Sequence, residues 1–450
     1  MNSRLVRTVL AGAMLAQSGV VFGQSNAVVD LKDFRPREIK SAVFSIGSAQ
    51  DVRVEAVGAE SSSERGTFSW VTAMWKDKND TRRDPWMGNA WILDLKSRRV
   101  VWELSAATTE RGRRNTRAFA GSVRLPAGTY EAFYSPFPSM YWSDDKGDAS
   151  TTQRFLNWLA DEGFDEFRMT VRGDAQVLNG AEAERARREF EAGAIVTLRG
   201  DAGKKFMESG FVLSRPTDVE IYAAGEARED GDFDAGWIVN AETREKVWKL
   251  SWRASAPAGG AEKNRMARLS KTLPPGRYAA FYVTDDSHDS SSWNAAPPYD
   301  PHAWGLVVRV PDAAARASVK PFIVAENPDP SIVAQLVRLR DDENPRKSFK
   351  LDRESQIRIY ALGEGGSRLV DYGWIEDAKT GKAVWEMTYR VTGPAGGAAK
   401  NRRFDGTITL PAGEYVLRYE TDDSHSFQSW NASPPDDPQM WGITIYRVKS

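Results

Sequence analysis

The sequence contains no cysteine among its 450 residues. That absence excludes disulfide bonds, thiol catalysis, cysteine-attached haem and zinc–thiolate sites. Histidine is scarce too, with three residues, so nitrogen ligands for a transition metal are few. Neither sign of charge is in excess, since 61 basic residues stand against 62 acidic ones. A strongly basic surface is therefore excluded, and we expect no nucleic-acid partner.

Apolar runs that could span a bilayer are also lacking. The N-terminal apolar stretch, residues 9–22, is shorter than the ~20 residues that a span needs. It follows Arg4 and Arg7, a combination typical of a secretory signal peptide, which we predict over residues 1–23. We therefore expect a secreted or periplasmic protein with no transmembrane segment after the signal is removed. An uncleaved N-terminal anchor is the alternative.

An internal repeat is what the sequence does contain. Four tryptophans recur 137 residues further along the chain, so the two copies align without a net insertion between them. The pairs are Trp237 and Trp374, Trp248 and Trp385, Trp293 and Trp430, and Trp304 and Trp441. A more divergent copy precedes them, in which LPAGTY (125–130) corresponds to LPPGRY (273–278). This first copy carries an insert with a helical pattern at residues 151–160.

Each copy has the pattern of short strands. Segments such as VEIYA and IRIYA alternate apolar and polar residues, and clusters of Gly, Pro and Asp separate them. We predict an all-β fold of three tandem antiparallel β-sandwich repeats, jelly-roll or immunoglobulin-like, joined by short helical or Pro/Ala-rich linkers. After the signal peptide (1–23), the predicted boundaries are 24–172 for repeat 1, 173–194 for a charged helical linker, 195–311 for repeat 2, 312–331 for a linker and 332–450 for repeat 3.

Three motifs carry a family resemblance: V-x-I-Y-A-x-G, W-I-x-D-A-x-T-G-K and L-P-A-G-x-Y. With this strand pattern, the copies resemble secreted sandwich modules of the bacterial prepeptidase C-terminal type and of the GOLD type. The resemblance is one of fold, and it implies accessory binding or targeting units rather than enzymes. It assigns no functional residue.

The most distinctive repeated element is a long loop, residues 284–305 and 421–442, called here the repeated loop. It combines acids, a histidine, a Trp-Asn pair and Pro-Pro. Alternate connections of an antiparallel sandwich meet at one end, so residues 257–265 and 394–402 should lie beside it and form a rim. A Trp next to Asn can stack on a sugar ring while polar groups bind its hydroxyls. The predicted ligand-binding residues are Trp293, Asn294, Lys263, Arg265, Trp430, Asn431, Lys400 and Arg402. In the alternative, each tryptophan packs inward and holds the loop.

The acids of the repeated loop suggest calcium as a candidate cofactor, because calcium takes six to eight oxygen ligands. The candidate ligands are Asp285, Asp286, Asp300, Asp422, Asp423 and Asp437. Asx-type turns and ion pairs with the neighbouring rim are the alternative. His288 and His425 occupy the same position, and we expect each to order its loop by a hydrogen bond to a nearby aspartate.

No catalytic motif of the G-x-S-x-G, P-loop or H-E-x-x-H type occurs. The predicted function is that of an exported, non-catalytic binding protein whose rim loops in repeats 2 and 3 take a ligand, with a glycan as the candidate. One alternative is a structural or scaffold protein of the cell envelope, and another is a carboxylate-dependent hydrolase. The candidate partners are a polysaccharide or an envelope protein, and the oligomeric state is left open.

Overall fold

The computed structural model describes residues 27–35, 38–60, 86–111, 116–138, 166–229, 231–290, 292–325 and 329–448. These residues form antiparallel β-sheets with few short helices, which confirms the predicted all-β class. The predicted signal peptide and the helical insert of the first copy lie outside the described residues. Among the described residues, no helix has both the length and the apolar character needed to cross a membrane.

Three sheets follow one another along the chain with a shared order of strands, except that the third has no counterpart of β10 and β20 among the described residues. The first sheet contains β1 (Ala27–Leu31), β2 (Lys40–Ile46), β3 (Gln50–Glu60), β4 (Trp86–Asp94), β5 (Arg99–Glu103), β6 (Glu110–Arg111), β7 (Thr116–Leu125), β8 (Gly128–Pro138), β9 (Arg168–Arg172) and β10 (Gln176–Leu178). The second contains β11 (Ala194–Arg199), β12 (Phe206–Leu213), β13 (Thr217–Arg228), β14 (Gly231–Asn240), β15 (Lys246–Lys249), β16 (Ala256–Pro257), β17 (Asn264–Leu273), β18 (Gly276–Val283), β19 (Gly305–Arg309) and β20 (Lys320–Phe322). The third contains β21 (Ile332–Val337), β22 (Arg346–Leu351), β23 (Ser355–Gly365), β24 (Leu369–Asp377), β25 (Ala383–Glu386), β26 (Gly393–Pro394), β27 (Asn401–Leu410), β28 (Gly413–Glu420) and β29 (Gly442–Arg447).

The helical segments are short and lie between strands. They are η1 (Ala106–Thr108), α3 (Ala181–Arg188), η5 (Glu189–Glu191), η6 (Trp252–Ala254), η7 (Pro301–Ala303), α4 (Ala313–Ala317), η8 (Tyr389–Val391) and η9 (Pro438–Met440). The charged segment between the first two sheets therefore forms a helix, α3, as its Ala, Glu and Arg content predicts.

The second sheet folds into two layers with apolar side chains between them. In the second sheet, β13 pairs with β17 and β19, while β14 pairs with β15 and β18. Among the described residues, the two groups of strands are joined where the ends of β13 and β14 pair, at 226–228. Ile221 and Val308 of one layer and Ile238 and Tyr282 of the other are at most 1% exposed and belong to the same core. The alternation read from the sequence thus places every second side chain in this core.

The Leu-Pro-x-Gly-x-Tyr motif forms the same local hydrogen bond in each copy. In all three copies the tyrosine hydroxyl donates to the carbonyl oxygen of the motif proline, four residues earlier, at 2.8–2.9 Å. The pairs are Tyr130 with Pro126, Tyr278 with Pro274, and Tyr415 with Pro411. The bond closes the turn, and the ring fills the end of the core below it.

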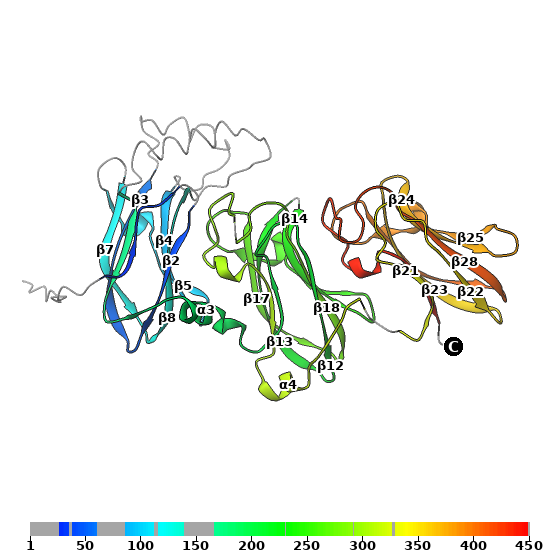
Figure 1. Ribbon diagram of the computed structural model, residues 1–450, viewed down its shortest axis with the longest axis horizontal. Coiled ribbons are helices and arrows are strands. Elements are labelled where there is room, and N and C mark those ends of the chain that lie inside the picture. Colours follow the sequence, from blue (N-terminus) through cyan, green and yellow to red (C-terminus); the bar gives the residue numbers. More distant parts are fainter. Residues whose placement is uncertain are drawn as a thin grey trace, which may run out of the picture.

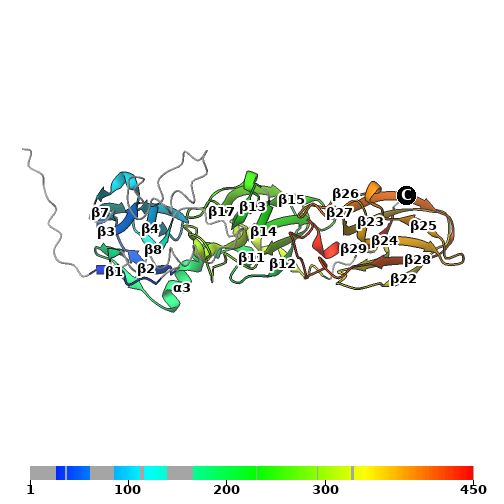
Figure 2. The same cartoon turned by 90° about the horizontal axis from the view of Figure 1, so that it is seen from above.

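Figures 1 and 2 show the three sheets in a row along the longest axis of the molecule. The repeated loop of the second sheet (yellow-green) lies on the side that faces the first sheet. The repeated loop of the third sheet (orange-red) lies on the side that faces the second (Figure 1). Each repeated loop is therefore placed at a junction between neighbouring sheets.

Candidate functional site

The repeated loop folds onto itself around three aromatic rings. Trp293 and Trp304 meet edge to face, with ring centroids 5.2 Å apart and planes at 89°. The imidazole of His288 contacts both rings in the same manner, at 4.9 and 5.6 Å. The third sheet repeats this cluster with His425, Trp430 and Trp441, whose centroids are 5.1–5.7 Å apart. The three rings form a small core within the loop, because their edge-to-face packing holds the two ends of the loop together.

Two asparagine amides, of which Asn264 is buried and Asn294 is partly exposed, hold the histidine from both sides. His288 Nε2 lies 2.5 Å from Asn264 Oδ1, and Nδ1 lies 2.8 Å from Asn294 Oδ1. The amide of Asn264 donates to the carbonyl oxygens of Gly259 and Ala296, so its oxygen must accept and Nε2 carries a proton. The sequence led us to expect an aspartate as partner; that expectation is wrong, since asparagine side chains occupy both positions.

The third sheet reproduces this network around His425. Its Nε2 and Nδ1 lie 2.6 and 2.9 Å from Asn401 Oδ1 and Asn431 Oδ1. Burial, followed by the nearby lysine, lowers the pKa of His425 to about 4 (Lys400) and that of His288 well below its ordinary value (Lys263). Two acceptor oxygens favour a proton on both ring nitrogens while burial favours the neutral ring, and in either state the histidine has a structural role.

The rim loops meet as antiparallel geometry predicts. The N–H of Ala261 donates to the carbonyl of Ala296, and the N–H of Tyr299 donates to Ala258. Gly260 adopts φ +66°, and a Cβ there would collide with the Pro297 carbonyl. The Gly-Gly of this segment thus lets the backbone touch the Pro-Pro of the repeated loop.

The tip of each repeated loop packs against the sheet that precedes it. Trp91 of the first sheet donates its indole N–H to the carbonyl oxygen of Tyr299 at 2.8 Å. At the next junction, Trp237 donates in the same way to Asp436, the residue that corresponds to Tyr299, at 2.7 Å. Both indoles stack on a phenylalanine of the neighbouring strand and are at most 3% exposed. The two junctions therefore share one docking mode.

A buried ion pair accompanies each docked indole. Arg98 lies in the β4–β5 turn and binds both oxygens of Asp300, with Nε 2.7 Å from Oδ2. Tyr222 also donates to Asp300 Oδ2, at 2.8 Å. The corresponding Arg244 faces Asp437 at 3.7 Å. Both arginines have positive φ (52° and 68°), and the local turn hydrogen bonds from Arg98 N–H to Asp94 and from Arg244 N–H to Asn240 accompany this conformation.

The third sheet has a surface equivalent to the one around Trp91 and Trp237. Among the described residues no loop docks on it, and its side chains are more polar. Trp374 takes the position of Trp91 and Trp237, but it is only half-buried and donates to Glu376 at 2.8 Å. The stacking phenylalanine is replaced by Arg418, and the docking arginine by Gly381. The polar replacements suit a face that meets solvent.

The predicted ligand-binding residues are engaged within the protein. Trp293 is 5% exposed, and Lys263 is 2% exposed with its ammonium bound to Glu226 and Asn294 at 2.8 and 2.9 Å. Arg265 stacks on Trp252. In the third sheet, Lys400 binds Glu364 and Asn431, Arg402 stacks on Tyr389, and Trp430 is half-buried against His425. Ligand binding by these eight residues stays a prediction, and their contacts give them structural roles.

The six predicted metal ligands do not come together. Asp300 and Asp437 serve the two docking pairs, Asp286 pairs with Lys204 at the surface, and Asp423 is exposed. Asp285 and Asp422 each accept the N–H two residues ahead, which is an Asx turn. Of the six, only Asp422 belongs to a cluster of carboxylates, which it shares with Glu364 and Asp371.

A fully buried glutamate marks the first junction. Glu131 accepts hydrogen bonds from Ser41 and Arg187, and His302 of the second sheet approaches it at 3.3 Å. Burial raises the pKa of Glu131, but the hydrogen bonds and charges of His302 and Arg187 outweigh it and lower the pKa to about 2. A pKa lowered on folding stabilises the protein above the unfolded pKa, near 4.5.

We therefore expect Glu131 to contribute up to about 3 kcal/mol of stability at neutral pH, lost as pH falls from about 4.5 toward 2. Thermal unfolding of wild type and Glu131→Gln at pH 6 and pH 3 checks this. The wild type should lose more stability than the variant between the two pH values. Glu55→Gln, at an exposed ion pair with Arg53, is the control. Equal losses of stability in wild type and Glu131→Gln would contradict the lowered pKa of Glu131.

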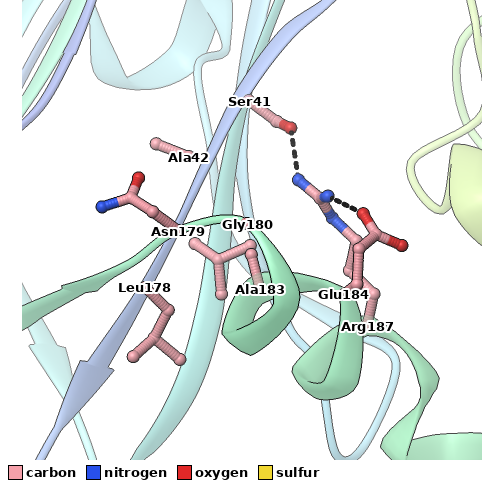
Figure 3. A pocket seen from close by; sticks show the side chains of 9 residues that line it. Ser41, Ala42, Leu178, Asn179, Gly180, Ala183, Glu184 and Arg187 are labelled. Atoms are coloured by element: carbon pink, nitrogen blue, oxygen red, sulfur yellow. Dashed lines mark hydrogen bonds and ion pairs between the residues drawn. The ribbon is translucent and has the colours of Figure 1, made fainter.

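A shallow hollow of about 260 Å³ lies where α3 crosses β2 (Figure 3). Ser41 and Arg187 face each other across it, and Leu178 and Ala183 line its apolar side. Ser41 donates its hydroxyl hydrogen to Glu131 and accepts one from Arg187, so it belongs to the buried network of that glutamate. The hollow is the seam between a linker helix and its sheet.

Sequence reasoning missed Arg98, Arg244 and the fully buried Trp91 as partners of the repeated loop. The signal was present, since Arg98 and Arg244 occupy equivalent turn positions while Gly381 stands in the third copy. A comparison with protein-family models and another with curated proteins find no match to this chain.

Proposed function

We propose that the protein is an exported, non-catalytic scaffold in which three copies of one β-sandwich are docked end to end as a semi-rigid rod. The observation that carries the proposal is the repetition of one docking geometry at two junctions. The hydrogen bond from indole to backbone carbonyl recurs at both. An arginine faces an aspartate at both, hydrogen-bonded at the first junction and 3.7 Å away at the second, and a tyrosine, Tyr222 or Tyr360, lies beside each aspartate. On this proposal the repeated loop occurs twice because the described chain has two junctions.

The internal contacts of the rim support the same proposal. In the second sheet, Lys263, Asn294 and His288 are bound to one another, Asp285 caps a turn and Asp300 pairs with an arginine. A site for catalysis or ligand capture needs polar groups that still have unused hydrogen-bonding capacity. A role in spacing or presenting other parts of an envelope assembly needs only the rod.

Rigidity across the junctions tests the proposal. Because the chain has no cysteine, label pairs can be introduced uniquely at the exposed positions Arg124, Lys271 and Lys350. We expect a narrow distance distribution for Arg124→Cys/Lys271→Cys and for Lys271→Cys/Lys350→Cys in spin-label or fluorescence measurements. Broad distributions in both pairs would show that the sandwiches move independently and would reject the rod. Retention on a polysaccharide resin that Trp430→Ala abolishes would instead favour the binding protein expected from the sequence.

A further inference from the structure

The base of the repeated loop in the third sheet gathers carboxylates that the protein does not neutralise. Oxygen atoms of Glu364, Asp371 and Asp422 lie within 4.8 Å of one another. Asp371 is fully buried and Glu364 is 7% exposed. Asp371 Oδ2 and Glu364 Oε2 are buried and have no hydrogen-bond partner. Burial raises the pKa of Asp371 to about 7 and raises that of Glu364, so keeping both groups ionised at neutral pH costs free energy that a bound cation would offset.

A fourth acid adds to this excess. Asp341 has a buried Oδ1 with no partner, and its charge acts on both Glu364 and His425. The ammonium of Lys400, 2.7 Å from Glu364, is the cation bound to the cluster. One lysine cannot balance four carboxylates.

The second sheet shows how the same positions are satisfied without an external ion. There, Glu226, Asp234 and Asp285 correspond to the three clustered acids. Glu226 pairs with Lys263 at 2.8 Å and with Arg228 at 3.7 Å. Asp234 Oδ2 accepts the indole N–H of Trp304 at 2.8 Å.

Three changes distinguish the third sheet from the second. Gly366 takes the position of Arg228, so one cation is lost. Asp341 takes the position of Gly203, so one acid is gained. The two positions correspond because the residue that follows each, Asp342 or Lys204, donates its N–H to the carbonyl of the first aspartate of the repeated loop. The Trp441 indole N–H lies beside Asp371 and lowers its pKa, but it does not reach the hydrogen-bonding geometry that Trp304 makes with Asp234.

From these differences we propose that the third sheet binds one Ca²⁺ ion through Glu364, Asp371 and Asp422, with Asp341 adding negative charge nearby. Calcium fits because the donors are all oxygens and come from protein groups, whereas Mg²⁺ keeps several of its waters. The ligands come from the end of β23, the start of β24 and the start of the repeated loop, and Asp341 lies in the β21–β22 connection. The bound ion would fasten the loop that docks on the second sheet. The binding site itself does not depend on the scaffold proposal.

Calorimetric titration of the full, EDTA-treated protein with CaCl₂ tests the site. We expect one Ca²⁺ per chain with saturation at about 1 mM or below, the range of extracellular calcium modules. Asp371→Asn should weaken binding by at least 10- to 100-fold, the loss seen even for groups that only support metal ligands. The matched control is Asp234→Asn in the second sheet, which should keep the wild-type stoichiometry and affinity.

A second variant keeps the test valid if Asp371→Asn does not fold. Asp341→Gly/Gly366→Arg gives the third sheet the residues of the second, and a Cβ at Gly366 meets no atom within 4 Å. It should fold, bind no calcium and show no rise in melting temperature when calcium is added. No calcium binding by wild type, unchanged binding in this double variant, or tighter binding of Mg²⁺ than of Ca²⁺ would each overturn the proposal. Since none of these readouts measures rigidity, failure here is distinguishable from failure of the scaffold proposal.

Discussion

Trp237→Ala is expected to lower the stability of the junction between the second and third sheets by about 3–5 kcal/mol, the usual loss for a fully buried tryptophan. The side chain is 3% exposed, stacks on Phe281 at 5.3 Å and donates to the carbonyl of Asp436. Its removal leaves a cavity and an unpaired buried carbonyl at the same place. Differential scanning calorimetry should show a separate transition for the third sheet, and solution scattering should show a less rigid particle.

Trp374→Ala provides the matched control. It occupies the same strand position in the third sheet, where Arg418 replaces the phenylalanine and no loop docks among the described residues. We expect less than half of the stability loss and no change in rigidity. If the two substitutions have equal effects, the tryptophan stabilises its own sheet and docking contributes nothing measurable.

Arg98→Ala is expected to destabilise the junction between the first and second sheets by more than the size of the deleted side chain suggests. Arg98 and Asp300 are 6% and 7% exposed, and removing one partner of a buried ion pair typically costs 3–5 kcal/mol because the other charge stays uncompensated. After the substitution, Tyr222 would be the one remaining donor to Asp300 among the side chains described around it. The predicted result is early melting of the first sheet and wider label distances across that junction.

Arg358→Ala is the control for this experiment. Arg358 forms a two-pronged ion pair with Asp405 at 2.7 and 2.8 Å, but both side chains are about one-third exposed and lie away from the junctions. Such a pair contributes about 0–1 kcal/mol. The double substitution Arg98→Ala/Asp300→Ala should recover part of the loss, since it removes the uncompensated charge. A loss in the double variant equal to the sum of the single losses would contradict a direct pairing.

The sequence by itself determined the all-β class, because alternation of apolar residues and turn signals are local properties that survive in each copy. It also located the repeated loop and the rim beside it, since antiparallel connections return alternately to the same end. The tyrosine of the Leu-Pro-x-Gly-x-Tyr motif is a further local feature, with its partner four residues away.

Only the tertiary structure decided what the repeated loop does. Its tip contacts Trp91 and Arg98, which lie about two hundred residues earlier in the chain, and no periodicity relates residues at that distance. The sequence presented Trp-Asn and clustered aspartates, a composition shared by sugar sites, calcium sites and folded loops alike. Burial separates these alternatives, because it determines whether a tryptophan faces solvent or a neighbouring ring and whether an aspartate has an arginine beside it. The placement of Gly366 and Asp341 around the acidic cluster likewise depends on which strands meet in space, and this leaves the third sheet with buried carboxylates that the second sheet neutralises.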